Sequence, residues 1–278
     1  MPSFGTRGFS IYYEAYGDDD RTPLVLVMGM GGTCQGWTVT TVPELSKQRR
    51  VIIFDNRGAG RSEDPGTPFT TADMAEDTLA LLDALEIESA HVLGGFLGGM
   101  VAQELAIAHP DRVGCLILHG TWAKADAKRR AIIELWKEMI ENGVPAETRI
   151  RNRLAWTLGD ATFETDVMDR MWRFYLRDDA PMEEKVFTRQ AEAAIVHDAF
   201  DRLDRIQAPT LVVCGEEDIL TPPKLHRTLA AGIANSRLVE MAGGAHLVAA
   251  ELASRFNGLV LRFLEEHDPA ARPGAQRT

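Results

Sequence analysis

The chain has 278 residues, of which 45% are hydrophobic and 26% charged, and its net charge is −11. These proportions are typical of a globular protein. The negative net charge and the lack of a Lys/Arg cluster argue against a polyanion-binding surface, so we expect no nucleic-acid partner. We also expect no membrane partner, because the start lacks a signal-peptide pattern and no run approaches ~20 apolar residues. The three cysteines, Cys34, Cys115 and Cys214, show no metal-ligand spacing. We therefore expect a cytoplasmic protein with no metal site and no cofactor.

The first 85 residues alternate apolar runs with polar loops and one helical pattern. A β-hairpin is predicted over residues 3–17, where strand-forming residues are concentrated. Continuous apolar runs at 24–28 and 50–54 are typical of strands buried on both faces of a parallel sheet. A helix is predicted from Thr71, the expected N-cap, because apolar residues then recur on one helical face.

Residues 90–108 predict a strand, a tight turn and a helix. An apolar run at 90–93 enters the turn, paired glycines flank Phe96, and a helical pattern at 101–108 follows. Small residues are needed there because strand and helix almost touch, and we expect Phe96 at positive φ. Such turns also bind dinucleotide phosphates, but no acidic residue ends a second strand about 20 positions on, which disfavours that interpretation.

Strands and helices stop alternating after a further strand at 113–118. Only helical patterns follow, at 126–142, 146–158, 165–176 and 183–197, and their tryptophans, Trp136, Trp156 and Trp172, are assigned to helix packing. Alternation resumes with a strand at 208–215, a helix at 224–233, a strand at 237–241 and a helix at 248–266, before a floppy tail at 268–278. This order predicts an α/β fold with a mostly parallel, doubly wound sheet. We expect a core of residues 1–122 and 206–278 and an inserted all-helical cap, or lid, of residues 123–205.

The turn at Phe96 resembles the G-x-Nu-x-G nucleophile elbow of the α/β-hydrolases, with Gly94 and Gly98 at its outer positions. The family places Ser, Cys or Asp at the centre. Phe96 has no nucleophilic atom and cannot attack a carbonyl, so the resemblance implies the α/β-hydrolase fold while covalent hydrolysis is excluded for the chain as written.

Two further stretches resemble the family. Residues 27–32 resemble its H-G-x-G-G oxyanion loop, with Met28 for the usual His, which implies that the backbone amides of Met30 and Leu97 hold a developing oxyanion. Residues 55–62 match D-x-R-G-x-G-x-S, which is a structural turn in the family, and we expect the same role here.

Two loop residues match the family's acid and base. Asp218 follows the strand at 208–215, and His246 follows the strand at 237–241. The order of nucleophile position, acid and His is the one that the family requires. Glu216 and Glu217 are neighbouring carboxylates, but the position just before the apolar pair and the prolines favours Asp218. We expect His246 within hydrogen-bond reach of Asp218, roughly 2.6–3.2 Å.

An apolar substrate pocket is expected between the cap and the strand ends. Its predicted lining residues, besides Phe96, are Met28, Gly29, Cys34, Trp37 and Trp122. Cys34 is the one alternative nucleophile considered, and its position in the loop favours a wall residue.

Three functions remain open. The core is similar to the esterase and enol-lactonase branch, which implies action on a small apolar ester, lactone or related carbonyl compound, with Phe96 as an introduced or inactivating substitution. A second possibility is a lyase, isomerase, cyclase or cofactor-free oxygenase of this fold that uses His246 and Asp218 as a general base. The third is a non-catalytic ligand-binding receptor, which has no need of an oriented base. A small-molecule partner is expected in each case, and the sequence does not decide between a monomer and a homodimer.

Overall fold

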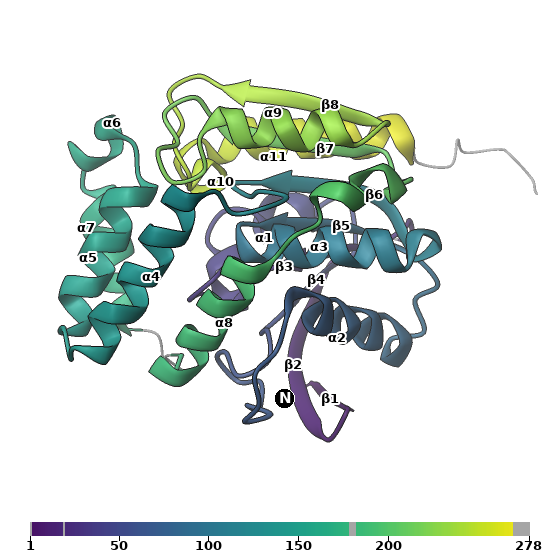
Figure 1. Ribbon diagram of the computed structural model, residues 1–278. Helices are drawn as coiled ribbons and strands as arrows, with labels where there is room; N and C mark the ends of the chain where they lie inside the picture. The colour runs from purple at the N-terminus through teal and green to yellow at the C-terminus, as the bar shows by residue number, and fades with distance from the viewer. Residues whose placement is uncertain (1, 19, 178–181, 269–278) are drawn as a thin grey trace, which may run out of the picture.

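The computed structural model describes residues 2–18, 20–177 and 182–268 (Figure 1). Within these ranges eight strands form one sheet in the order β1-β2-β4-β3-β5-β6-β7-β8. The β1–β2 and β2–β4 pairings are antiparallel, and the pairings from β4 to β8 are parallel. In chain order the strands span Ser3–Thr6, Phe9–Tyr16, Leu24–Val27, Val51–Phe54, Ala90–Gly95, Val113–His119, Thr210–Gly215 and Ser236–Met241. The predicted α/β fold with a mostly parallel sheet is therefore confirmed.

Helices cover both faces of the sheet, as Figure 1 shows. One face carries α2 (Thr71–Ala84), α3 (Leu97–Ala108) and α9 (Pro223–Gly232), and the other carries α1 (Val42–Leu45) and α11 (Ala253–His267). Alternate side chains of one strand consequently enter two different apolar clusters, as Val25 and Leu26 of β3 do. This double burial explains why β3 and β4 are apolar at every position.

Between β6 and β7 the described residues form helices and one isolated bridge, Lys124 to Asp198. The helices are α4 (Ala127–Glu141), α5 (Ala146–Thr157), α6 (Asp160–Phe163), α7 (Val167–Arg177) and α8 (Glu184–Val196), followed by a 3₁₀-helix at Phe200–Arg205. They lie beyond the carboxyl ends of the parallel strands (Figure 1). The predicted helices of this stretch are confirmed, and α6 is an addition. The division into a core and a cap stays a prediction.

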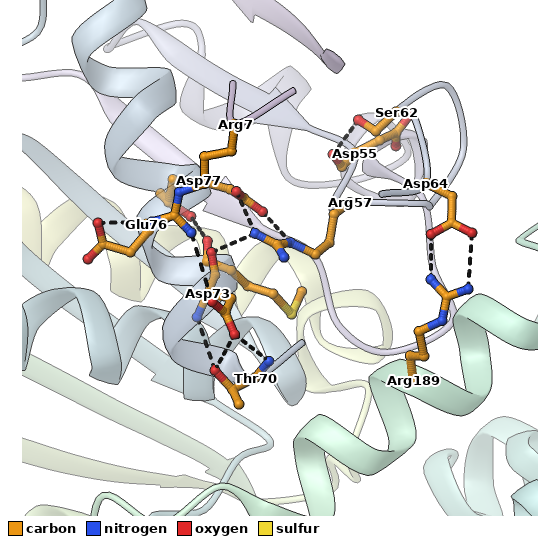
Figure 2. Close-up of polar contacts among 12 residues, drawn as sticks. Arg7, Asp55, Arg57, Ser62, Asp64, Thr70, Asp73, Glu76, Asp77 and Arg189 are labelled. Atoms are coloured by element: carbon orange, nitrogen blue, oxygen red, sulfur yellow. Dashed lines mark hydrogen bonds and ion pairs between the residues drawn. The ribbon is translucent and has the colours of Figure 1, made fainter. Parts of the chain in front are cut away.

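The loop after β4 is a structural turn (Figure 2). Asp55 accepts hydrogen bonds from the amides of Cys34 (2.7 Å) and Arg61 (2.9 Å). Arg57 forms two charged hydrogen bonds, of 2.5 and 2.7 Å, with the buried carboxylate of Asp77 in α2. Burial raises the pKa of Asp77 although Arg57 opposes this. The motif at 55–62 therefore holds β4 against α2, in agreement with its predicted structural role.

Two side chains of α8 attach that helix to loops of the sheet. Arg189 pairs with both carboxylate oxygens of Asp64 (Figure 2). Gln190, which is fully buried, accepts a hydrogen bond of 3.0 Å from the amide of Gly31. The loop after β3 is thus in direct contact with the inserted helices.

The N-cap of α2 differs from the prediction. Thr70, not Thr71, caps the helix: its hydroxyl accepts from the Asp73 amide (3.2 Å), and the Asp73 carboxylate accepts from the Thr70 amide (2.9 Å) (Figure 2). Thr71 is wrong as the cap because Asp73 lies three residues after Thr70, which is the spacing that a capping box needs.

The C-terminal region also differs. The predicted single helix is two, α10 (Val248–Glu251) and α11, because Leu252 departs from helical dihedrals at φ −117° and ψ 39°. Asp268, predicted to begin the floppy tail, accepts a hydrogen bond of 2.6 Å from Arg49, and residues 269–278 lie outside the described residues. Within the described ranges, no helix combines the length and apolar character needed to cross a bilayer.

Candidate active site

Phe96 lies at the turn between β5 and α3, with φ 49° and ψ −113°, which confirms the predicted positive φ. Its amide donates to the His119 carbonyl (3.0 Å), and its carbonyl accepts from the Gly99 amide (3.0 Å) and the Thr121 hydroxyl (2.8 Å). A non-glycine residue in this conformation costs about 1–3 kcal/mol, which these bonds offset. α3 begins at Leu97, immediately after the turn and earlier than the apolar pattern indicated.

Close backbone contacts explain the glycines on either side. A Cβ atom at Gly94 would lie 2.3 Å from the Gly98 carbonyl oxygen, and one at Gly98 would lie 2.1 Å from the carbonyl oxygen of Val27. Contacts this short leave room only for hydrogen, so β3, β5 and α3 meet here without any intervening side chain.

His246 and Asp218 meet at the carboxyl ends of β7 and β8. The His246 Nδ1 atom lies 3.0 Å from Asp218 Oδ2, within the expected range. Both side chains are buried, whereas Glu216 and Glu217 are exposed. The geometry therefore pairs the imidazole with the predicted carboxylate. Their role as base and acid stays a prediction.

Asp218 is held as a carboxylate by three neighbouring groups. Burial alone would raise its pKa, but His246 and hydrogen bonds from the Thr221 hydroxyl (2.5 Å) and amide (2.6 Å) outweigh burial and lower the pKa below its ordinary value. The Thr221 hydroxyl also lies 3.0 Å from His246 Nδ1. The ionised Asp218 accepts a hydrogen bond from the Nδ1–H group of His246, which leaves Nε2 as the ring nitrogen that faces a substrate.

The Phe96 ring lies beside this pair. Its centroid is 5.3 Å from that of His246 and 5.1 Å from that of Trp122, with the rings nearly perpendicular in both contacts. Edge-to-face contacts of this kind stabilise an aromatic cluster. Phe96 is only 7% exposed. Its side chain therefore places a buried apolar surface next to the imidazole of His246.

An apolar cavity of about 540 Å³ opens over the same residues. Of the predicted site residues, it is lined by Met28, Gly29, Met30, Trp37, Phe96 and His246. Side chains of α4, α5 and α7 line the opposite side. The strand ends and the inserted helices therefore line one cavity from opposite sides.

Two predicted wall residues, Cys34 and Trp122, are fully buried outside the cavity lining. Trp122 packs against Phe96 rather than facing the cavity. The Cys34 amide donates to Asp55, and burial, followed by the charge of Asp55, raises the pKa of its thiol far above the usual range. Cys34 is therefore not a competent nucleophile, since the thiolate is the reactive form.

A family model described as alpha/beta hydrolase fold matches residues 22–251. The chain belongs to this family. A protein of Azorhizobium caulinodans that bears the provisional name carbamate hydrolase RutD is 33% identical over 274 residues, covering 96% of this chain and 100% of that protein. A hydrolase from Pseudomonas aeruginosa PA01 superposes with a TM-score of 0.85 at 31% identity, over 95% of this chain and 97% of that one. The enol-lactonase from Burkholderia xenovorans LB400 superposes with a TM-score of 0.82 at 26% sequence identity, over 95% of this chain and 99% of that one.

In this α/β-hydrolase the two predicted oxyanion amides lie at the same end of the sheet. Leu97 is the first residue of α3, so its amide has no acceptor within the helix. Met30 lies in the loop after β3 and lines the cavity. Across the described ranges neither amide has a hydrogen-bond partner. Their assignment to an oxyanion hole stays a prediction.

Several lining residues of the α/β-hydrolase pocket escaped the sequence analysis, among them His119, Trp136, Arg153 and Tyr175. His119 ends β6 beside β5, and a polar residue at the carboxyl end of a buried strand is a signal that could have identified it. Burial, and then the charges of neighbouring histidines, lower the pKa of His119 to about 3. Neither of its ring nitrogens has a partner among the described residues. No group of three metal-ligating side chains occurs in the described ranges.

Proposed function

We propose that this α/β-hydrolase acts on a small, largely apolar ester, lactone or related carbonyl compound, with His246 as a general base that Asp218 orients. The observation that carries the proposal is the 3.0 Å contact of the buried Asp218 with His246, whose ring lines an apolar cavity. The names of the relatives, a carbamate hydrolase and an enol-lactonase, support hydrolysis at a carbonyl group.

Phe96 closes the covalent route, so the base acts on water. His246 Nε2 takes a proton from water as the water oxygen bonds to the carbonyl carbon, and the carbonyl electron pair moves to its oxygen. The amides of Met30 and Leu97 donate to that oxyanion, each contributing roughly 3–4 kcal/mol in acyl transfer. When the intermediate collapses, the leaving alkoxide takes the proton from His246, giving an acid and an alcohol.

The inserted helices act as a cap in this proposal. Residues of α4, α5 and α7 and of the strand ends line the same cavity, which supports a bound substrate enclosed between them. A cap at residues 123–205 would exclude bulk water and set which compounds enter.

A second candidate is a non-hydrolytic reaction, in which the same His246 removes a proton from carbon next to a carbonyl. The Phe96 ring, 5.3 Å from His246, favours it because an apolar surface beside the base disfavours water there. A receptor is a third candidate, although it leaves the Asp218–His246 pair without a purpose.

Phe96→Ser tests the proposal with p-nitrophenyl butyrate as substrate. The parent protein should give a slow, His246-dependent reaction, of the order of the 10³–10⁴-fold over water that remains without a triad nucleophile. The serine variant should recover much of the ~10⁶-fold that such a nucleophile contributes. His246→Ala is the matched control in both backgrounds and should abolish turnover.

A folded serine variant that stays inactive would show that the pocket serves other chemistry. If the parent binds aromatic esters tightly and His246→Ala changes neither binding nor the background rate, the receptor function is supported instead.

A further inference from the structure

We infer that the pocket takes a substrate that carries a carboxylate group, and that Arg153 of α5 is the residue that binds this carboxylate. The inference rests on the proposed small-molecule site and adds the charge of the compound and the residue that selects it.

Arg153 belongs to the face of α5 that is turned toward the cavity. Ile150, Arg153, Leu154 and Thr157 all line it, and their spacing of i, i+3, i+4 and i+7 defines one side of a helix. The other members of that stripe are apolar or small. Arg153 is partly buried there, and its guanidinium lies on a mainly apolar cavity wall, which is an unusual place for arginine.

The guanidinium group of Arg153 is fixed by two aromatic rings and by the loop after β3. Its Cζ lies 5.2 Å from the ring centroid of Phe187 and 5.9 Å from that of Tyr175. A Cβ at Gly31, whose φ is 76°, would lie only 2.3 Å from Arg153 Nη1. The cation therefore lies directly against the loop that carries the Met30 amide, a short distance from the proposed site of reaction.

Arg153 lacks an anionic partner. Across the described ranges no carboxylate forms an ion pair with it, whereas its neighbour Arg149 pairs with Glu184 at 2.5 Å. Arg170, another lining arginine, pairs with Asp166 at 3.2 Å. Burial, and then the charge of Arg149, lower the pKa of Arg153. A partly buried cation without a counter-ion has lost part of its hydration, and a bound anion would compensate for that loss.

A carboxylate fits this environment better than a phosphate. A guanidinium presents two parallel N–H donors that match the two oxygens of a carboxylate. The rest of the lining is mainly apolar, so a dianion would lack the further donors that it needs. The expected ligand is a monocarboxylate with an apolar body whose carbonyl reaches the Met30 amide.

Calorimetric binding of 4-phenylbutanoate and of its neutral isostere 4-phenylbutanamide tests the inference without turnover. The unaltered protein should bind the acid about 10- to 100-fold more tightly than the amide. Arg153→Met should remove this preference by weakening acid binding while amide binding stays the same. Arg153→Lys should retain part of it, and Arg170→Met, the matched lining control, should retain it in full.

Equal affinity of the unaltered protein for acid and amide would overturn the inference, and this comparison needs no variant to fold. A preference that survives Arg153→Met but is lost in His246→Gln would overturn it too, because the carboxylate would then bind at the base. If the protein shows no ester turnover but still binds the acid more tightly than the amide in an Arg153-dependent way, the proposed reaction is contradicted while the carboxylate site stands.

Discussion

The carboxyl edge of the sheet and the inserted helices build two walls of one cavity by different means. At the edge, backbone atoms touch so closely that a Cβ at Gly98 would lie 2.1 Å from a carbonyl oxygen. The inserted helices are held in place by side-chain contacts. Several of their large apolar side chains remain exposed to solvent, among them Leu135 (45% exposed) and Leu176 (38% exposed). The wall at the edge is thus shaped by the backbone, while the opposite wall depends on side chains that can change without altering the sheet.

The largest expected effect comes from adding one methyl group at the edge. Gly98→Ala should cost more than about 4 kcal/mol of unfolding free energy, or prevent folding, because a backbone oxygen cannot move aside as a side chain can. Gly159→Ala beside the inserted helices is the matched control. Its Cβ would meet the end of the exposed Glu217 side chain at 3.1 Å, and the cost should stay below about 1 kcal/mol. Urea unfolding measures both, and similar losses would contradict the comparison.

A smaller difference is expected between two arginines of Figure 2. Arg57→Met leaves the buried carboxylate of Asp77 unpaired and should cost about 3 kcal/mol, the lower end for a buried pair, because Asp77 can take up a proton. Arg189→Met, at the contact between α8 and Asp64, breaks a partly solvated pair and should cost about 1 kcal/mol. Thermal denaturation of both variants checks the order, and a larger loss at Arg189 would reverse our assignment.

The smallest of the three expected differences concerns pH. His119 has a folded pKa of about 3 against an ordinary 6.5, so the unfolded chain binds a proton first and stability is lost as the pH falls below 6.5. Between pH 6.5 and pH 5 this loss should reach about 1.6 kcal/mol. His119→Leu should remove it, which makes the variant less sensitive to acid than the unaltered protein. Identical pH profiles of the two unfolding free energies would show that His119 is accessible to protons in the folded state.

The edge of the sheet could be predicted from the sequence because its features are local. Glycines around Phe96 encode a tight turn within a few residues, and apolar runs place Asp218 and His246 after strands whose ends must meet. The strained φ of Phe96 and the 3.0 Å contact of the pair followed from that logic.

The opposite wall could not be predicted, because helical periodicity gives a buried face without saying what lies across from it. In the sequence nothing distinguishes Arg153 from the other charged residues of α5. Only the packing of α7 and α8 shows that its guanidinium lies near the rings of Tyr175 and Phe187. The position of Cys34 also depends on tertiary contacts that the sequence does not show, since its amide donates to Asp55 and the residue does not line the cavity.

The turn at residue 96 keeps its shape through hydrogen bonds of its own amide and carbonyl to β6, to Thr121 in the loop after β6 and to α3, and none of them involves the Phe96 side chain. The backbone turn therefore requires no particular side chain at this position, and the Phe96 ring adds only its packing against Trp122 and His246. Phenylalanine and serine codons can differ by a single base, so a gene on this scaffold can lose or regain a hydroxyl nucleophile in one mutational step.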